Sequence, residues 1–247
     1  GAGKRSLTPK PRVKQPGVPC QLHQQGKCRF GDRCIFDHTE AAWYLRGQAD
    51  LQHTHYELSG LPDSGESQPS RTLPVVSAEV GLRFERFTRS GRLQTLTPRG
   101  FALYVPFDDQ DQLPLFDTGE PDFDFVQLFA RNRFSGEDRL SDARHVAGAA
   151  TLRELDPETG TVLWSASIGQ LFRFDSPRVS LPGLIPPDRG ATEFIGQFDY
   201  ALTRNWSAVL AGQWSPEEDR FERSHLGIRY REPDRRNMVE LGYRYRR

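Results

Sequence analysis

Apolar and polar residues alternate along most of the chain from Trp43 onward. Successive side chains of a β-strand point to opposite faces of a sheet, so this period of two predicts strands with one apolar and one polar face. In the clearest example, Trp206, Leu210 and Trp214 share one parity with the small residues between them. The pattern predicts an all-β, antiparallel fold. Its nine expected strands cover residues 43–56, 74–88, 94–106, 144–154, 161–174, 192–202, 206–214, 221–231 and 238–246.

The spacing of the two tryptophans in segment 206–214 indicates a membrane-spanning strand. Trp206 and Trp214 lie eight residues apart, which is about 26 Å along a strand. A tilted strand of that length rises roughly 20 Å, close to the ~25 Å apolar band that aromatic girdles border in outer-membrane barrels. A soluble β-sandwich also alternates, but it does not need aromatic residues at both ends of an apolar stripe. We therefore expect a segment of an outer-membrane β-barrel.

The expected connections between strands alternate in length. Longer ones are expected at 57–73, 107–143, 175–191 and 215–220, and shorter ones at 89–93, 155–160, 203–205 and 232–237. Alternate connections of an antiparallel meander lie at opposite ends, and membrane barrels keep short turns at the periplasmic end and long loops outside. This alternation requires 107–143 to be one loop, so we do not count 126–135 as a strand.

Composition narrows the class further. The 247 residues carry a formal net charge of zero, and the mean hydropathy is −0.65. No stretch approaches the ~20 apolar residues of a membrane helix, whereas barrel strands average out to a polar composition. The N-terminal residues contain no apolar segment typical of a secretory signal, so an export signal is expected upstream of them. No nucleophile–base arrangement or phosphate-binding glycine loop is present, and we predict no enzyme.

All three cysteines lie between Cys20 and Cys34, which favours one metal site over a disulfide framework. The spacing Cys20-x7-Cys28-x5-Cys34-x3-His38 supplies three thiolates and one imidazole. Four such ligands complete a tetrahedral shell, so we predict a structural Zn²⁺ without an open catalytic position. His23 is an alternative ligand by proximity, but it does not fit the spacing.

Residues 20–38 resemble the Cys3His (CCCH) zinc fingers that bind single-stranded RNA. The resemblance implies that Phe30 and Phe36 stack on bases and that basic side chains approach phosphates. Those basic residues are Lys27, Arg29 and Arg33. Residues 1–19 are basic and rich in proline, and we expect a disordered tail there. Residues 39–42 are the expected junction with the β-rich part.

Residues 42–247 resemble a second family, the lipopolysaccharide-assembly outer-membrane protein LptD. The motifs that carry this resemblance occur in the family's order and extend over about four-fifths of the chain. They are Leu96-Thr-Pro-Arg99, Leu103-Tyr-Val-Pro106, Phe129-Ala-Arg-Asn-Arg-Phe-Ser-Gly-Glu-Asp-Arg139, Ser167-Ile-Gly-Gln170, Phe198-Asp-Tyr-Ala-Leu202 and Leu241-Gly-Tyr-Arg-Tyr-Arg246. Residues 43–247 are accordingly expected to form a partial LptD-like barrel domain in the outer membrane.

The LptD resemblance implies a part in delivering lipopolysaccharide to the outer leaflet, with a plug lipoprotein of the LptE type as partner. Lipid leaves such a barrel laterally between strands, and no covalent chemistry is involved. Arg-rich lumenal faces would hold anionic headgroups, and loop 107–143 would fold inward over the lumen. The family barrel has more than twice as many strands, so this segment alone is expected not to close. The motif residues of the loop are Asn132, Arg133, Phe134, Gly136, Asp138 and Arg139.

The two resemblances point to different compartments. A finger of free thiols tends to oxidise in the periplasm, and barrel strands expose apolar faces in the cytosol. The chain therefore reads as a fusion or an artificial junction, and the sequence leaves open whether that junction is natural, engineered or an assembly error. One alternative is an RNA-binding finger protein with an incidental β-rich remainder. Another is a soluble β-domain of structural role.

Overall fold

The computed structural model describes residues 41–58, 68–216, 218–232 and 237–246. The predicted tail and zinc finger, residues 1–38, lie outside these ranges. Within them, the strands form a single antiparallel sheet. The strands are β1 (Ala41–His55), β2 (Ser70–Phe87), β3 (Leu93–Val105), β4 (Ala143–Leu155), β5 (Val162–Arg173), β6 (Gly190–Ala191), β7 (Phe194–Ala201), β8 (Trp206–Ser215), β9 (Arg220–Arg231) and β10 (Met238–Arg246).

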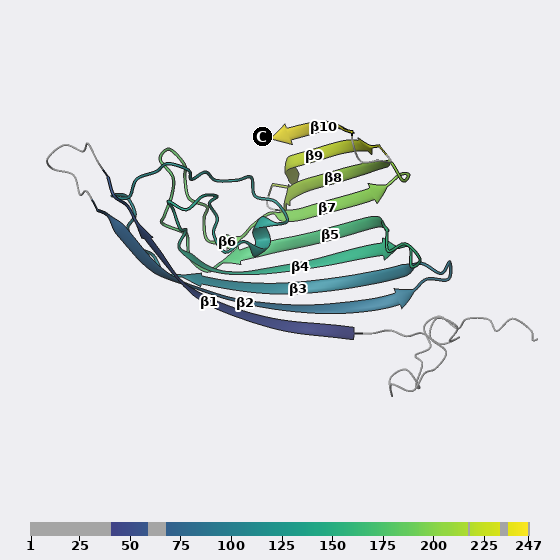
Figure 1. Cartoon of the computed structure of the whole chain (residues 1–247), viewed down its shortest axis with the longest axis horizontal. Coiled ribbons are helices and arrows are strands. Elements are labelled where there is room, and N and C mark those ends of the chain that lie inside the picture. Colours follow the sequence, from purple (N-terminus) through teal and green to yellow (C-terminus); the bar gives the residue numbers. More distant parts are fainter. Residues whose placement is uncertain (1–40, 59–67, 217, 233–236, 247) are drawn as a thin grey trace, which may run out of the picture.

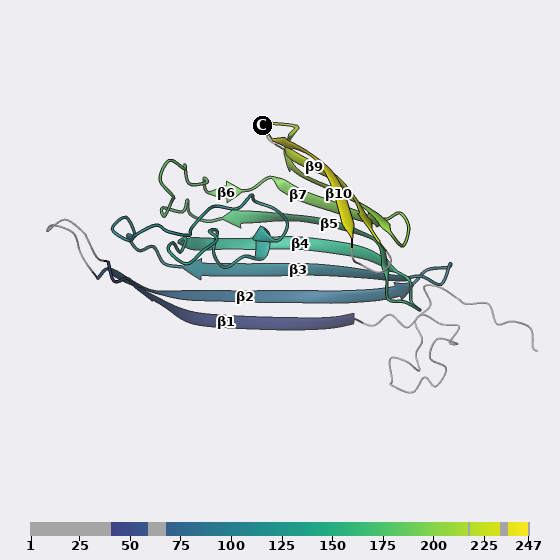
Figure 2. The ribbon, with the colours of Figure 1, turned by 45° about the horizontal axis from the view of Figure 1, so that its top comes forward.

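The sheet is an open meander. Its strand order is β1-β2-β3-β4-β5-β7-β8-β9-β10, with β6 paired to β5 beside this path. β1 and β10 lie at opposite edges of the sheet, and the strands between them follow in chain order (Figure 1). The second view shows that the sheet curls, because β9 and β10 run at a steep angle to β1 and β2 (Figure 2). The expected all-β, antiparallel and unclosed sheet is confirmed, and it is consistent with a segment of a barrel.

The sixth expected strand, 192–202, is divided in the structure. β6 ends at Ala191 and β7 begins at Phe194, so the described sheet has ten strands instead of nine. The cause is Thr192, whose hydroxyl oxygen accepts a hydrogen bond from the backbone N–H of Leu171 at 3.1 Å. A side chain thereby replaces a backbone carbonyl in the ladder, and the register beyond it is broken. β2 also begins earlier than expected, at Ser70 instead of residue 74, because it pairs with β1 as far as His55.

The connections alternate between the two ends of the sheet as the sequence predicted, but the predicted difference in length fails at 216–219, which is shorter than the turn 88–92. The long-loop end of the sheet carries residues 56–69, 106–142, 174–193 and 216–219, and the turn end carries 88–92, 156–161, 202–205 and 232–237. Residues 126–135 are not a strand: the loop contains the short 3-10 helix η2 (Gln127–Phe129). Among the described residues, no helix is long and apolar enough to cross a membrane.

One side of the sheet, here named the apolar face, exposes large apolar side chains on every strand of the main path. Cross-strand pairs such as Trp43–Leu82 and Leu210–Leu226 place these residues side by side. Aromatic rings meet near both ends of this face: Trp206 packs on Tyr230 at the turn end, with ring centroids 5.0 Å apart, and Phe194 packs on Trp214 at the long-loop end, 6.2 Å apart. The exposed apolar residues include Trp43, Leu45, Val80, Leu82, Leu96, Val146, Ile168, Phe198, Leu210, Leu226, Ile228, Leu241 and Tyr243.

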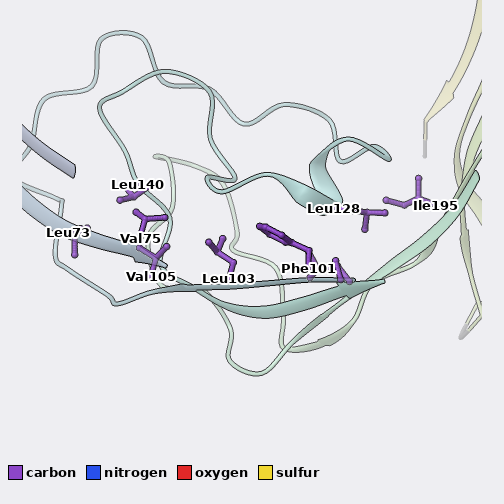
Figure 3. Close-up of a cluster of buried hydrophobic side chains, with 10 residues drawn as sticks. Leu73, Val75, Phe101, Leu103, Val105, Leu128, Leu140 and Ile195 are labelled. Carbon is purple, nitrogen blue, oxygen red and sulfur yellow. The ribbon is translucent and has the colours of Figure 1, made fainter. Parts of the chain in front are cut away.

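The other side, here named the loop face, is covered at its long-loop end by residues 106–142. A buried core lies between this loop and the sheet. Leu128 and Leu140 reach down from the loop, and Phe101 and Leu103 reach up from β3 (Figure 3). Leu128 is fully buried and Leu140 is 1% exposed. The apolar parity of β3 therefore faces the loop, whereas the apolar parities of its neighbours β2 and β4 face outward over most of their length.

Candidate functional site

Arg71 is the centre of a buried polar network that anchors loop 106–142 to the sheet. It lies near the start of β2, in phase with Leu73 and Val75, and is 3% exposed. One terminal nitrogen, Nη1, donates to Oε1 of Gln110 at 2.6 Å and to the carbonyl of Asp138 at 3.0 Å. Its Nη2 donates to Thr54 and to the carbonyl of Glu137, each at 3.1 Å. One guanidinium group thus ties β1, β2 and two parts of the loop together.

Gln110 completes this network. Its Nε2 donates to the carbonyl of Leu140 at 2.8 Å, and its Oε1 accepts from the Leu140 N–H at 3.1 Å. The side-chain amide therefore pairs with one residue as a strand neighbour would. Because both partners are nearly fully buried, losing either side would leave unsatisfied polar groups, which costs about 1–3 kcal/mol each.

Asp138 is a second anchor in the same network. Its Oδ2 accepts hydrogen bonds from the backbone N–H groups of Phe116 (2.6 Å) and Asp117 (2.8 Å), and its Oδ1 accepts one from the Tyr56 hydroxyl (3.0 Å). Burial disfavours the charged carboxylate, but these donors outweigh it and lower the pKa of Asp138. Burial, and then the hydrogen bond to Asp138, raise the pKa of Tyr56.

The neighbouring motif residues fold the loop back on itself. Asn132 donates to the carbonyl of Arg139 at 2.8 Å and accepts from the N–H of Ser141 at 3.0 Å. Arg139, which is 6% exposed, donates to the carbonyls of Leu113 and Pro114 at 2.8 and 3.0 Å. Their polar atoms are occupied within the loop itself.

Gly136 allows the tight turn that brings this hairpin together. Its φ is +79°, in the left-handed region, and a Cβ there would lie 2.6 Å from the carbonyl oxygen of Asp117. The bridge between Gly119 and Ser135 continues the contact. Both the backbone angle and the close approach exclude a side chain at this position.

Arg133 connects loop 106–142 with the next long loop. It donates to Glu120 at 2.9 Å and to the carbonyl of Val179 at 2.7 Å, and its guanidinium lies over the ring of Phe134 with 4.6 Å to the centroid. Phe134 packs in a small core with Val179 and Leu181. Asp142 adds a second link, since its carboxylate accepts the N–H groups of Arg178 and Val179. The two loops form one layer over the sheet.

The centre of the loop rests on the sheet through apolar and cation–π contacts. Leu128 lies over Gly169 of β5, where an added Cβ would come within 2.5 Å of a Leu128 methyl carbon. The Arg99 guanidinium stacks on the ring of Phe129 at 3.8 Å. A glycine on the loop face of β5 therefore makes room for the apolar anchor of the loop.

The structure brings all six predicted motif residues into this anchoring layer. Asn132, Asp138 and Arg139 make hydrogen bonds that hold the loop, and Gly136 shapes its turn. Tyr56, Arg71 and Gln110 were not predicted from the sequence. One signal was available for Arg71: an arginine in phase with two apolar residues that become buried must itself be buried and paired.

The rest of the loop face is open. A recess of about 960 Å³ lies over β5 and β7–β10, bordered by the loop residues Asp122 and Phe123. Charged side chains of both signs line it. Arg223 pairs with Asp122 at 2.8 Å, and Arg229 pairs with Glu240 at 2.9 Å. This hollow, lined by charged and apolar side chains together, lies on the side of the sheet opposite the apolar face.

Metal binding has no candidate within the described ranges. No group of three or more His, Cys, Asp or Glu side chains in the part of the chain that the structure covers is placed to hold an ion. The predicted zinc ligands, Cys20, Cys28, Cys34 and His38, lie outside those ranges. So do the predicted RNA-contacting residues Lys27, Arg29, Phe30, Arg33 and Phe36.

Comparison with known proteins decides between the competing interpretations of the β-rich part. The family model described as LptD, LPS transport system D, matches residues 36–247. The chain belongs to the LptD family. The match begins within the predicted finger, two residues before His38, and runs through every described strand. Members of this family are outer-membrane proteins, and the described sheet is a segment of such a protein.

Individual relatives agree. The LPS-assembly protein LptD of Aromatoleum aromaticum is 39% identical over 212 residues, covering 83% of this chain and 26% of the relative. The LPS-assembly protein LptD of Nitrosococcus oceani is 38% identical over 200 residues, covering 80% of this chain and 27% of the relative. The chain therefore spans about a quarter of the length of these LptD proteins.

Proposed function

We propose that this chain forms part of the wall of an LptD barrel that delivers lipopolysaccharide to the outer leaflet. The family match carries the proposal, and the two faces of the sheet support it. The apolar face suits hydrocarbon, and the polar loop face suits a lumen. In this arrangement the long-loop end faces the exterior and the turn end faces the periplasm.

The anchored loop gives this wall a fixed internal layer. Loop 106–142 covers the loop face through Arg71, Asp138 and Leu128, so it narrows the lumen on the exterior side. The open recess over β5–β10 is the remaining space in which lipopolysaccharide, or a plug lipoprotein of the LptE type, would meet this segment. No covalent chemistry is part of the proposal: the segment would contact lipopolysaccharide or the partner lipoprotein and separate the lumen from the membrane.

A cross-linking experiment tests this role. The segment is placed in the corresponding position of the Aromatoleum aromaticum LptD, and a photo-reactive amino acid replaces Gln197 or Ser207, both of which line the recess. The proposal predicts adducts with lipopolysaccharide or with the partner lipoprotein. The control position, Thr159, lies in an exposed turn and does not line the recess. A hybrid that supports growth but gives neither adduct from the recess would contradict the proposal.

We propose separately that Cys20, Cys28, Cys34 and His38 bind one structural Zn²⁺. The spacing of four soft ligands supports this assignment. Native mass spectrometry of the full chain should detect one zinc that a chelator removes. A Cys28→Ser chain that keeps the same zinc stoichiometry would contradict it. RNA contacts by Phe30 and Phe36 remain a prediction that depends on this finger.

A further inference from the structure

A small cavity lies between the sheet and its two covering loops, beside the open recess, with which it shares Phe123 and Gln127. It has a volume of about 50 Å³, whereas a single water needs roughly 10–15 Å³. β4 and β5 form its floor with His145 and Arg173, which are directly paired across the strands. Loop 106–142 forms its cover with Arg131 and Arg133. The cavity is therefore large enough for a group bigger than one water.

Two buried nitrogens of residues that line this cavity lack hydrogen-bond partners among the described residues: Arg131 Nε is a donor, and His145 Nε2 is a donor in the tautomer protonated there. Two other nitrogens of the lining are satisfied, since Arg131 pairs with Asp50 and Arg133 pairs with Glu120 through their terminal groups. Unsatisfied buried polar groups are rare and costly, and two of them lining one cavity indicate that a hydrogen-bonding group belongs there.

The side chain of Arg173 is the strongest indication that this cavity binds an anion. Its side chain is mostly buried, and within the described ranges it forms no hydrogen bond or ion pair with an acidic residue. Its described contact is the ring of Phe123, 5.8 Å from the guanidinium carbon. The acidic residues of the lining are engaged elsewhere: Asp142 binds two backbone N–H groups, and Asp175 pairs with Arg144 at 3.4 Å. The carboxylates of Glu193 and Glu120 attract the Arg173 guanidinium electrostatically, but neither forms an ion pair with it, so among the described residues its hydrogen-bond donors have no acidic partner in contact.

We propose that this cavity, formed by Arg131, His145 and Arg173, binds a phosphate group. Donors approach from the loop and from two strands, which suits a tetrahedral anion with several acceptor oxygens better than a planar carboxylate with two. Arginine is also the side chain best suited to phosphate. Arg144 and Asp175, each 64% exposed, stand at the rim and leave the cavity accessible from the long-loop end.

The phosphate group has two possible sources, a lipid headgroup or free phosphate. Only the lipid source rests on the proposed function, because the rim faces the exterior side in that arrangement. The anion site itself rests on the cavity and its unpaired donors. It would remain if the chain took no part in lipid delivery.

The test measures phosphate binding to the full chain folded in phosphatidylcholine vesicles. Titration with inorganic phosphate, at constant ionic strength set by chloride, should show one saturable site by calorimetry and a raised unfolding midpoint. Arg173→Gln should weaken binding at least about tenfold, because a charge-assisted hydrogen bond is lost. The matched control is Arg153→Gln, an exposed arginine on the same face of β4 at the turn end, which should bind as the wild type does.

Vesicles containing phosphatidic acid separate the two sources. If they weaken the apparent affinity for inorganic phosphate, a lipid headgroup reaches the site, and if they do not, the site takes soluble phosphate. The proposal is overturned if the folded wild-type chain binds phosphate no better than chloride. This result does not depend on a variant that folds. Equal phosphate affinity in wild type and Arg173→Gln would also overturn it.

Discussion

The hydroxyl group of Tyr56 donates a 3.0 Å hydrogen bond to Oδ1 of Asp138, 82 residues further along the chain. This bond joins the residue just after β1 to the loop between β3 and β4. Together with Arg71, it makes the position of loop 106–142 depend on polar contacts as much as on its apolar core. The loop is thus fastened at its edge by buried hydrogen bonds and at its centre by Leu128.

Replacing Asp138 with asparagine should weaken the hydrogen bonds that hold loop 106–142 to the residues after β1. The amide nitrogen would face either the two backbone N–H donors or the Tyr56 hydroxyl, and one buried donor would lose its acceptor. We expect a loss of about 1–3 kcal/mol in unfolding free energy. Urea unfolding in detergent measures it. Asp109→Asn is the control, because Asp109 is exposed and bonds only within its own turn; an equal loss in both variants would contradict the assigned role.

The same network should depend on pH. The pKa of Asp138 is lowered on folding, so its contribution is fully present above the ordinary aspartate pKa of about 3.9 and is lost as pH falls below it. The pKa of Tyr56 is raised, so its contribution is lost only as pH rises beyond about 10. The urea midpoint should therefore fall more steeply with acid in wild type than in Asp138→Asn. Parallel curves would show that Asp138 is not the titrating anchor.

Alanine substitutions at two glycines with the same backbone angle can distinguish the cost of the left-handed conformation from the cost of steric crowding. Gly136 and Gly91 both have φ of +79°, but a Cβ at Gly91 meets nothing within 4 Å, whereas one at Gly136 meets the Asp117 carbonyl at 2.6 Å. Gly91→Ala should cost roughly 1–2 kcal/mol for the left-handed conformation alone. Gly136→Ala should cost clearly more in the same urea titration. Equal costs would mean that the loop shifts to accept the methyl group.

The strands, their order and the alternation of loops could be predicted from the sequence, because every second residue of segments such as 206–214 faces the same side. Two features could not. The apolar residues Phe101, Leu103 and Val105 have the same periodicity as a lipid-facing strand, yet they face the loop; periodicity alone does not say which side is which. The break between β6 and β7 at Thr192 also leaves no trace in the alternation of apolar and polar residues, because it depends on one hydroxyl group replacing a backbone carbonyl.

The site was less predictable than the fold. The motif residues from Asn132 to Arg139 were identified through the family resemblance, but their hydrogen-bond partners lie far away in sequence. Whether Arg173 forms an ion pair depends on which side chains the fold places next to it. It depends on which acids are occupied by other groups, and only the packed loops determine that.

The two faces should tolerate charge differently. Leu226 lies on the apolar face of β9 and is 48% exposed, and the adjacent His225 lies on the loop face beside the recess. Leu226→Arg should cost about 2–4 kcal/mol in lipid vesicles, as an arginine does near the middle of a bilayer. His225→Arg should cost little. The folded fraction of each variant is measured by the mobility of unheated samples in detergent gels. Similar losses of folded protein in both variants would contradict the assignment of faces.

Whether the apolar face meets the membrane can be measured most directly with the four tryptophans of the chain, Trp43, Trp164, Trp206 and Trp214. All four lie on the apolar face, on β1, β5 and β8. In vesicles containing brominated phospholipid, their fluorescence should be strongly quenched, and aqueous acrylamide should quench it weakly. Strong quenching by acrylamide with little effect of the brominated lipid would contradict the claim that this face meets the membrane.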